Sequence, residues 1–139
     1  MKNHLTSGQR PSSFERAAQL VNAGQYGFGE ALAELIDELK KMDGEKLSAA
    51  MMVEPALLEK SNADYDDWQD AYLAAAAEHL ARGAGINIPG WTEGRERFLR
   101  RAWFDNHGLT SLNATMLAES PLSFRRRFIF TEAKPLRRA

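Results

Sequence analysis

The chain has 139 residues, of which 44% are hydrophobic and 27% are charged, a composition typical of one globular domain around a single core. It contains no cysteine, which excludes disulfides, thiolate zinc sites and a thiol nucleophile. Charged residues interrupt every apolar stretch well before the roughly 18 residues of a membrane span, and the first ten residues lack the apolar core of a signal peptide. We therefore expect a cytoplasmic, bacterial-like protein that does not associate with a membrane.

The formal net charge of −1 conceals a division along the chain. Residues 1–94 hold 15 acidic and 8 basic side chains, whereas residues 95–139 hold 4 acidic and 10 basic ones, so the two parts carry −7 and +6. A clustered basic surface attracts phosphates or an acidic protein. Two interpretations stay open: the basic part faces a partner, or the two parts pack together and neutralise each other.

Three helical segments are predicted in the first sixty residues. The hydroxyls of residues 12–13 cap a first helix, in which Phe14 begins an apolar stripe that runs to Gly24. A second helix follows Gly27 and ends near residues 43–44, because its apolar residues recur at i, i+4, i+7, i+8 and i+11. Residues 46–60 surround Pro55 and are expected to form two short helical turns broken at that proline.

The longest helix is predicted to begin in the acidic run at residues 62–67. Carboxylates are favoured there because the backbone N–H groups of a first helical turn are unpaired. Apolar residues continue the pattern, and Ala74 to Ala77 present a flat surface against which another helix can pack closely. We expect the helix over residues 65–82 to be central to the core, to end at Gly83 and Gly85, and to be followed by an extended turn around Pro89.

The basic part is predicted to start with a basic amphipathic helix after Thr92. Its apolar residues, which lie at helical intervals among four arginines, are Phe98, Leu99, Ala102 and Trp103.

The remaining residues complete the predicted fold. A short helix covers residues 109–118 with Thr110 or Ser111 as its cap, and Pro121 opens a last helical turn. Residues 128–130 are consecutive apolar residues, which fit a short strand or a tail laid across the core. The fold class is therefore all-α: a compact bundle of six or seven helices with an extended C-terminal segment, formed by one domain (residues 11–139) after a flexible N-terminus (residues 1–10).

The combined spacing of several short segments resembles a family of small, mostly uncharacterised bacterial proteins. The resemblance covers about residues 28–139. The segments that carry it are Ala77–Ala81, Pro89–Trp91, Phe98–Leu99, Trp103–Phe104, Ser120–Pro121, Phe124–Arg127 and Ile129–Phe130. The chain departs from the pattern where it has Ala102 in place of proline and Phe128 in place of asparagine, and the second departure bears on a polar contact of the tail.

The resemblance implies an antitoxin-like or regulatory binding protein, because relatives often lie beside genes for nucleotidyltransferase-like proteins. It transfers no catalytic residue to this chain. Five residues of the shared pattern are expected to be structural: Trp91, Trp103, Phe124, Arg127 and Phe130. Arg127 is expected to turn inward, since the apolar residues on either side of it should be buried.

No metal-binding, calcium-loop or phosphate-loop motif is complete in this sequence. The three histidines lie far apart, and none stands in an H-E-x-x-H arrangement. Residues 62–73 fail as a calcium loop, because Asp67 replaces the required glycine and Leu73 the bidentate glutamate. The glycines of residues 24–29 are not followed by the lysine and hydroxyl residue of a phosphate loop. We expect no metal, no cofactor and no catalytic residue.

Six arginines of the basic part are the candidate binding residues: Arg95, Arg97, Arg100, Arg101, Arg125 and Arg126. Aromatic residues lie beside them in the sequence, and this combination suits an acidic protein partner as well as nucleic acid. We expect a non-catalytic regulatory or partner-binding protein whose partner is a nucleotidyltransferase-like neighbour. The alternative, a nucleic-acid-binding protein, is disfavoured by a pI of about 6.3. An uncharacterised enzyme is the third hypothesis, and homo-oligomerisation is left open.

Overall fold

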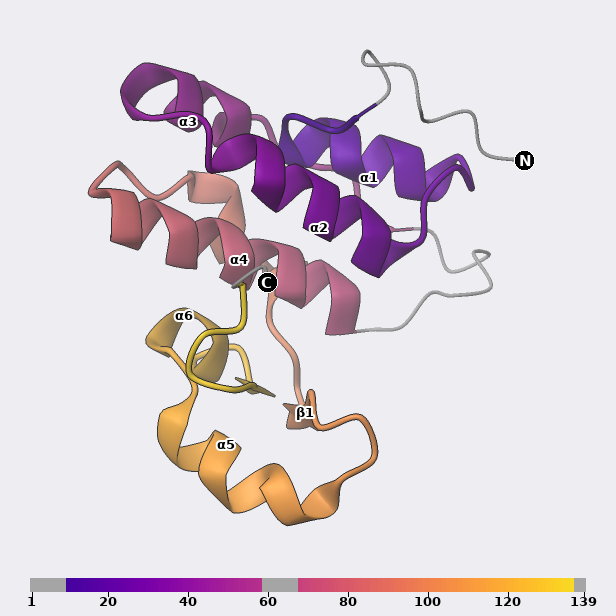
Figure 1. Cartoon of the computed structure of the whole chain (residues 1–139), viewed down its shortest axis with the longest axis vertical. Helices are drawn as coiled ribbons and strands as arrows, with labels where there is room; N and C mark the ends of the chain where they lie inside the picture. The colour runs from indigo at the N-terminus through magenta and orange to yellow at the C-terminus, as the bar shows by residue number, and fades with distance from the viewer. Residues whose placement is uncertain (1–9, 59–67, 137–139) are drawn as a thin grey trace.

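Helices dominate the computed structural model, which describes residues 10–58 and 68–136 (Figure 1). The α-helices are α1 (Phe14–Asn22), α2 (Phe28–Leu39), α3 (Gly44–Met52), α4 (Trp68–Ala84), α5 (Asn113–Glu119) and α6 (Leu122–Arg125). Short 3₁₀ helices are η2 (Gly90–Glu93), η3 (Arg95–Arg97) and η4 (Thr110–Leu112). Strands β1 (Trp103–Phe104) and β2 (Ile129–Phe130) pair in parallel, Trp103 with Ile129 and Phe104 with Phe130. The predicted all-α fold class is confirmed.

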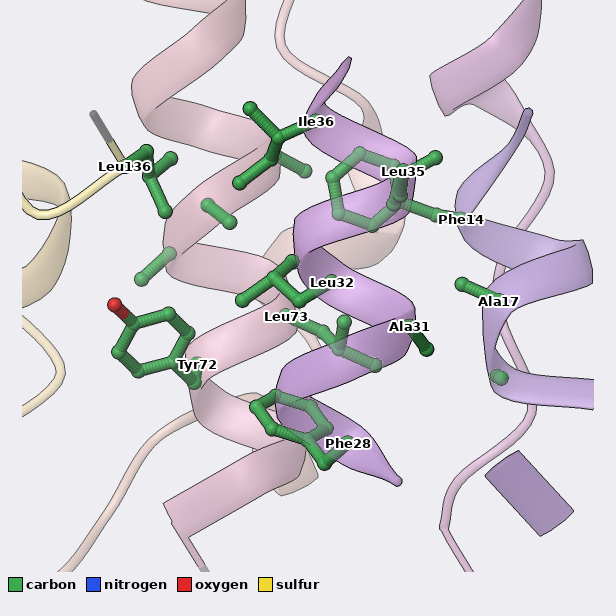
Figure 2. Packing of buried hydrophobic residues seen from close by; sticks show 14 of the residues in the cluster. Phe14, Ala17, Phe28, Ala31, Leu32, Leu35, Ile36, Tyr72, Leu73 and Leu136 are labelled. Atoms are coloured by element: carbon green, nitrogen blue, oxygen red, sulfur yellow. The ribbon is translucent and has the colours of Figure 1, made fainter. Parts of the chain in front are cut away.

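The first two helices form where the sequence predicts them. Ser13 Oγ accepts a hydrogen bond from the backbone N–H of Arg16 at 3.0 Å, which satisfies a donor in the first turn of α1. Helix α2 ends at Leu39, before the predicted residues 43–44. In Figure 2 the labelled side chains of α2 lie between those of α1 (Phe14 and Ala17) and those of α4 (Tyr72 and Leu73). The apolar faces of these three helices therefore share one core.

Helix α4 is the central element. Its residues Ala74–Ala77 are fully buried, which agrees with the predicted close packing. Helix α6 and the 3₁₀ helices η2 and η3 pack on α4. Leu136 of the C-terminal segment is buried in the same hydrophobic core (Figure 2). The helix passes through Gly83 and ends before Gly85, whose φ of +71° suits glycine. Its predicted acidic first turn lies outside the described residues.

The predicted helical turn after Pro55 is wrong for residues 55–58, and residues 59–60 lie outside the described residues. A single helix, α3, precedes the proline, and residues 54–58 lie in neither a helix nor a strand. Side chains satisfy the backbone of this stretch instead: Arg97 Nη2 donates to the carbonyl of Pro55 at 2.6 Å, and the N–H of Leu58 donates to Asp70 Oδ1 at 3.0 Å. Long-range hydrogen bonds thus replace those of a helical turn.

The predicted basic amphipathic helix after Thr92 is also wrong. Two 3₁₀ helices lie within residues 90–97, and residues 98–102, with bends at Phe98, Arg100 and Arg101, then lead into β1 without a helical turn. The N–H of Leu99 donates to the carbonyl of Arg127 at 3.3 Å, and the N–H of Trp103 donates to the carbonyl of Phe128 at 2.9 Å. Pairing with a distant segment therefore takes the backbone donors that a helix would have used, a competition that helical spacing cannot reveal.

Two predicted helix starts differ in detail. Thr110 and Ser111 lie inside η4, and Leu112 precedes α5 without a side-chain capping bond. Pro121 precedes α6 as its N-cap instead of occupying its first helical position. These shifts leave the predicted order of elements unchanged.

The described chain begins at the boundary of the predicted flexible N-terminus. Arg10 forms ion pairs with Glu34 (2.6 Å) and Glu38 (3.1 Å) of α2, while residues 1–9 lie outside the described part. Over residues 10–58 and 68–136, we find no helix with both the length and the apolar character needed to cross a membrane.

Candidate binding site: an arginine-lined groove

A groove of about 1180 Å³ lies between the start of α4 and the segment that leads into β1. Three of the six candidate arginines, Arg95, Arg100 and Arg101, line it. The other described lining residues are Leu57, Leu58, Trp68, Asp70, Glu93, Glu96, Phe98, Leu99, Ala102 and Trp103. The groove therefore combines guanidinium groups, carboxylates and aromatic rings.

The segment that leads from η3 to β1 carries these arginines at the surface. Leu99 and Trp103 pack against the core, whereas Arg100 and Arg101 between them are exposed, as is Arg95 in η3. Within residues 10–58 and 68–136, none of the three arginines forms an ion pair. Among the described residues, no carboxylate therefore neutralises these three charges.

An aromatic surface forms part of the groove wall. The rings of Trp68 and Trp103 stack with centroids 4.1 Å apart and planes 5° apart, and both are partly buried. Tyr72 of α4 contacts both rings edge to face. Stacked and edge-on rings are rigid, so this wall is preorganised for contact with an apolar group.

Arg97, a candidate binding residue, is fully buried and lies outside the groove lining. Its Nη2 donates to the carbonyl of Pro55, its Nη1 lies 3.7 Å from Asp70 Oδ1, and its guanidinium lies over the ring of Trp91, 5.0 Å from the centroid. Arg97 therefore ties the segment after α3 to α4 and η3, which is a structural role.

Arg125 is exposed and also has a structural contact. Its Nη2 donates to the carbonyls of Ala118 (3.1 Å) and Ser120 (2.9 Å), at the C-terminal end of α5. The last carbonyls of a helix have no partner inside the helix, and a cation is favoured there. Arg125 therefore caps α5 and is not brought to the groove.

Arg126 and Arg127 converge on Glu78 of α4. The side chains of Arg127 and Glu78 are fully buried, and Nη1 of Arg127 donates to Oε1 of Glu78 at 2.6 Å. Arg127 also donates to the carbonyls of Ser123 (2.8 Å) and Thr92 (2.7 Å). The predicted inward position of Arg127 is thus what the structure shows, and the two charged parts of the chain do partly neutralise each other.

Burial alone would raise the pKa of Glu78, but hydrogen bonds from Arg127, Arg82 and Arg126 outweigh it and lower the pKa to about 2. The carboxylate is therefore ionised at neutral pH. Arg126 also forms a two-bond pair with Glu93, from Nη1 to Oε2 at 2.8 Å and from Nη2 to Oε1 at 3.1 Å. Hydrogen bonding to Arg126 is the main reason that the pKa of Glu93 is lowered.

The aromatic residues of the shared pattern lie in or against the core. Trp91 Nε1 donates to the carbonyl of Met51 at 2.8 Å, near the end of α3. Phe124 is fully buried, and Phe130 is 9% exposed and stacks on Phe104. Of these aromatic residues, Trp103 alone is among the described lining residues of the groove.

Sequence reasoning missed the acidic partners of the arginines. The sequence does carry a signal that Glu78 has an internal partner, because this lone carboxylate directly follows the buried run of alanines Ala74–Ala77. A charged residue beside such a buried run needs a partner of opposite charge. The partner itself, 49 positions away, could not be identified from spacing. Glu93 carries no comparable signal.

The structure shows no group of three or more histidine, aspartate or glutamate residues able to hold a metal ion in its described ranges. No family model, curated protein or solved structure matches this chain. The family resemblance therefore stays a prediction, and function is inferred from the groove itself.

Proposed function

We propose that this chain is a non-catalytic, regulatory binding protein that holds an acidic segment of a partner protein in the arginine-lined groove. The observation that carries the proposal is the convergence of Arg95, Arg100 and Arg101 on one hollow without an ion pair among the described residues. The other predicted binding arginines have internal partners, so they are not part of the proposed binding set, with the exception of Arg126 considered below.

The charge balance of the groove favours an anionic ligand. Two of its three carboxylates, Asp70 and Glu93, are already matched by Arg97 and Arg126 from outside the lining. Glu96 forms no ion pair in the described chain, so three cations stand against one unmatched anion. An acidic segment is therefore attracted at long range, and its association should weaken as salt screens the charges.

The chemistry of the wall favours a protein over a nucleic acid. Arginine and tryptophan are the residues that most often anchor protein interfaces, and Trp103 lies on the wall beside Arg101. Glu93 and Glu96 interrupt the cations, which suits alternating acidic and apolar side chains better than an uninterrupted phosphate backbone. Nucleic acid remains the second candidate, because arginines beside partly exposed rings also suit stacked bases.

The first experiment measures binding of a fluorescein-labelled peptide of glutamates with one tryptophan by fluorescence anisotropy at low salt. Replacing Arg95, Arg100 and Arg101 together with alanine should raise the Kd at least about tenfold, since each charge contributes a few tenths to about 1 kcal/mol. The matched control replaces Lys40, Lys41 and Lys46, three exposed cations outside the groove, and should change the Kd less than about twofold.

An equal loss in the two triple variants, or no binding by the wild type, would overturn the proposal. A single-stranded DNA oligonucleotide is measured beside the peptide. Tighter binding of DNA, lost in the arginine variant and steeply dependent on salt, would establish the nucleic-acid alternative instead. Co-expression with the neighbouring nucleotidyltransferase-like protein that the resemblance implies then tests a specific partner, and the arginine variant should fail to co-purify with it.

A further inference from the structure

The pair between Arg126 and Glu93 lies at the edge of the groove. Glu93 lines the groove and its side chain is 53% exposed, while the side chain of Arg126 is 33% exposed. The guanidinium of Arg126 lies over the ring of Phe98, 5.3 Å from its centroid, and that ring also lines the groove. Arg126 itself lies outside the groove lining, but both groups that it contacts here, Glu93 and Phe98, line the groove. Removing the carboxylate of Glu93 would therefore leave a guanidinium on an aromatic face at the edge of the groove.

The geometry of the pair is that of carboxylate recognition. Two nitrogens of Arg126 each donate to a different oxygen of Glu93, at 2.8 and 3.1 Å. This two-bond arrangement matches the planar, two-oxygen shape of a carboxylate. A second acidic side chain could make the same two bonds.

The fold does not depend on this pair alone. The buried carboxylate of Glu78 keeps Arg127 and Arg82 as donors when Glu93 moves, and Arg126 itself keeps its bond to Glu78. The backbone beside Glu93 is anchored through the carbonyl of Thr92, which accepts from Arg127. Rotation of the Glu93 side chain into water is therefore enough to free the guanidinium, and a half-exposed ion pair opposes that rotation only weakly.

We propose that Arg126 and the ring of Phe98 form a carboxylate-binding subsite of the groove, which Glu93 occupies until an aspartate or glutamate of the partner replaces it. The inference rests on the proposed function of the groove and adds a regulatory element to it. Glu93 is an internal competitor that weakens binding of acidic segments, so only a partner whose other residues engage the groove displaces it.

The experiment compares Glu93→Gln with Glu96→Gln. Both residues line the groove, and each substitution removes one negative charge, but only Glu93 is bonded to Arg126. With the labelled glutamate peptide, Glu93→Gln should lower the Kd about fivefold or more, whereas Glu96→Gln should lower it less than about twofold, the size of a general charge effect. Adding Arg126→Gln to Glu93→Gln should remove the gain.

Equal tightening by the two glutamine variants, or a gain that survives Arg126→Gln, would overturn the subsite and leave the groove proposal in place. The groove proposal fails separately if the triple arginine variant binds the peptide as the wild type does. Absence of peptide binding in all proteins overturns both. Urea unfolding of each variant checks folding. If Glu93→Gln folds poorly, Glu93→Asp takes its place: it keeps the charge but shortens the side chain, and its gain in affinity should be smaller than the roughly fivefold gain expected for Glu93→Gln.

Discussion

Arg127 and Glu78 form a fully buried ion pair, with Nη1 of Arg127 donating to Oε1 of Glu78 at 2.6 Å. The pair joins the C-terminal segment to the central helix α4, so it sets the position of the elements that frame the groove. Arg127 binds the carbonyl of Thr92 as well, and thereby fixes η2 and the backbone next to Glu93.

Replacing Arg127 with methionine should lower the free energy of unfolding by about 3–5 kcal/mol, because it leaves a buried carboxylate without its main partner. The control is Arg82→Ala, which removes a donor to the same carboxylate from a side chain that is 48% exposed. That change should lower the free energy by no more than about 1 kcal/mol. Urea unfolding measures both, and similar losses in the two variants would contradict the dominant role of Arg127.

The pH dependence of stability should show the ionisation of Glu78. Its pKa is lowered from 4.5 to about 2 in the folded protein, so its contribution is fully present above pH 4.5 and is lost as the pH falls toward 2. This difference between the two pKa values corresponds to about 3 kcal/mol of folding free energy, since one pKa unit is about 1.4 kcal/mol. Urea midpoints between pH 6 and pH 2.5 measure this loss, and the curve of Glu78→Gln should lack that component.

Arg97 and Arg100, three positions apart, should differ sharply in their effect on stability. Arg97 is fully buried between Pro55, Asp70 and the ring of Trp91, so Arg97→Met should lower the free energy of unfolding by about 3 kcal/mol or more. Arg100 is exposed, and Arg100→Met should change it by less than about 0.5 kcal/mol. Thermal unfolding of the two variants measures the contrast, which a helical arrangement of this segment would not produce.

Phe128 adopts a left-handed backbone conformation, with φ at +65°, and its side chain is exposed. Its N–H donates to the carbonyl of Arg125 and its own carbonyl accepts from Trp103, which holds it there. Asparagine, which the family resemblance places at this position, tolerates that conformation better than phenylalanine. Phe128→Asn should therefore raise the free energy of unfolding by about 1 kcal/mol.

The matched control for this substitution is Phe128→Ala, which also removes the exposed ring but keeps a residue disfavoured at positive φ. Its stability should stay within about 0.5 kcal/mol of the wild type. A rise as large as that of the asparagine variant would assign the effect to loss of the ring and not to backbone strain.

Helical spacing was sufficient to predict a helix where that helix buries a stripe of its own residues. The stripe of Phe28, Leu35 and Leu39 predicted α2, and the capping hydroxyl of Ser13 predicted the start of α1. These signals depend on neighbours within a few positions, which the sequence displays directly. The run of consecutive apolar residues predicted a short strand or a tail laid across the core, and Ile129–Phe130 form a short, buried strand.

The fate of the arginines required the tertiary structure. Arg97 and Arg100 look alike in the sequence, yet Arg97 supports the segment after α3 and Arg100 lines the groove. The inward turn of Arg127 was predicted, but its partner Glu78 was not. Pairing of residues 103–104 with residues 129–130 also took backbone donors of a segment whose spacing alone favours a helix.

The sequence by itself therefore determined the all-α class, most helix positions and the separation of charge between the two parts of the chain. The tertiary structure decided which charges are neutralised inside and which face the groove. The physical reason is the range of the interactions: helix formation depends on contacts within one or two turns, whereas burial of a guanidinium depends on a carboxylate or carbonyl that the fold brings from tens of residues away.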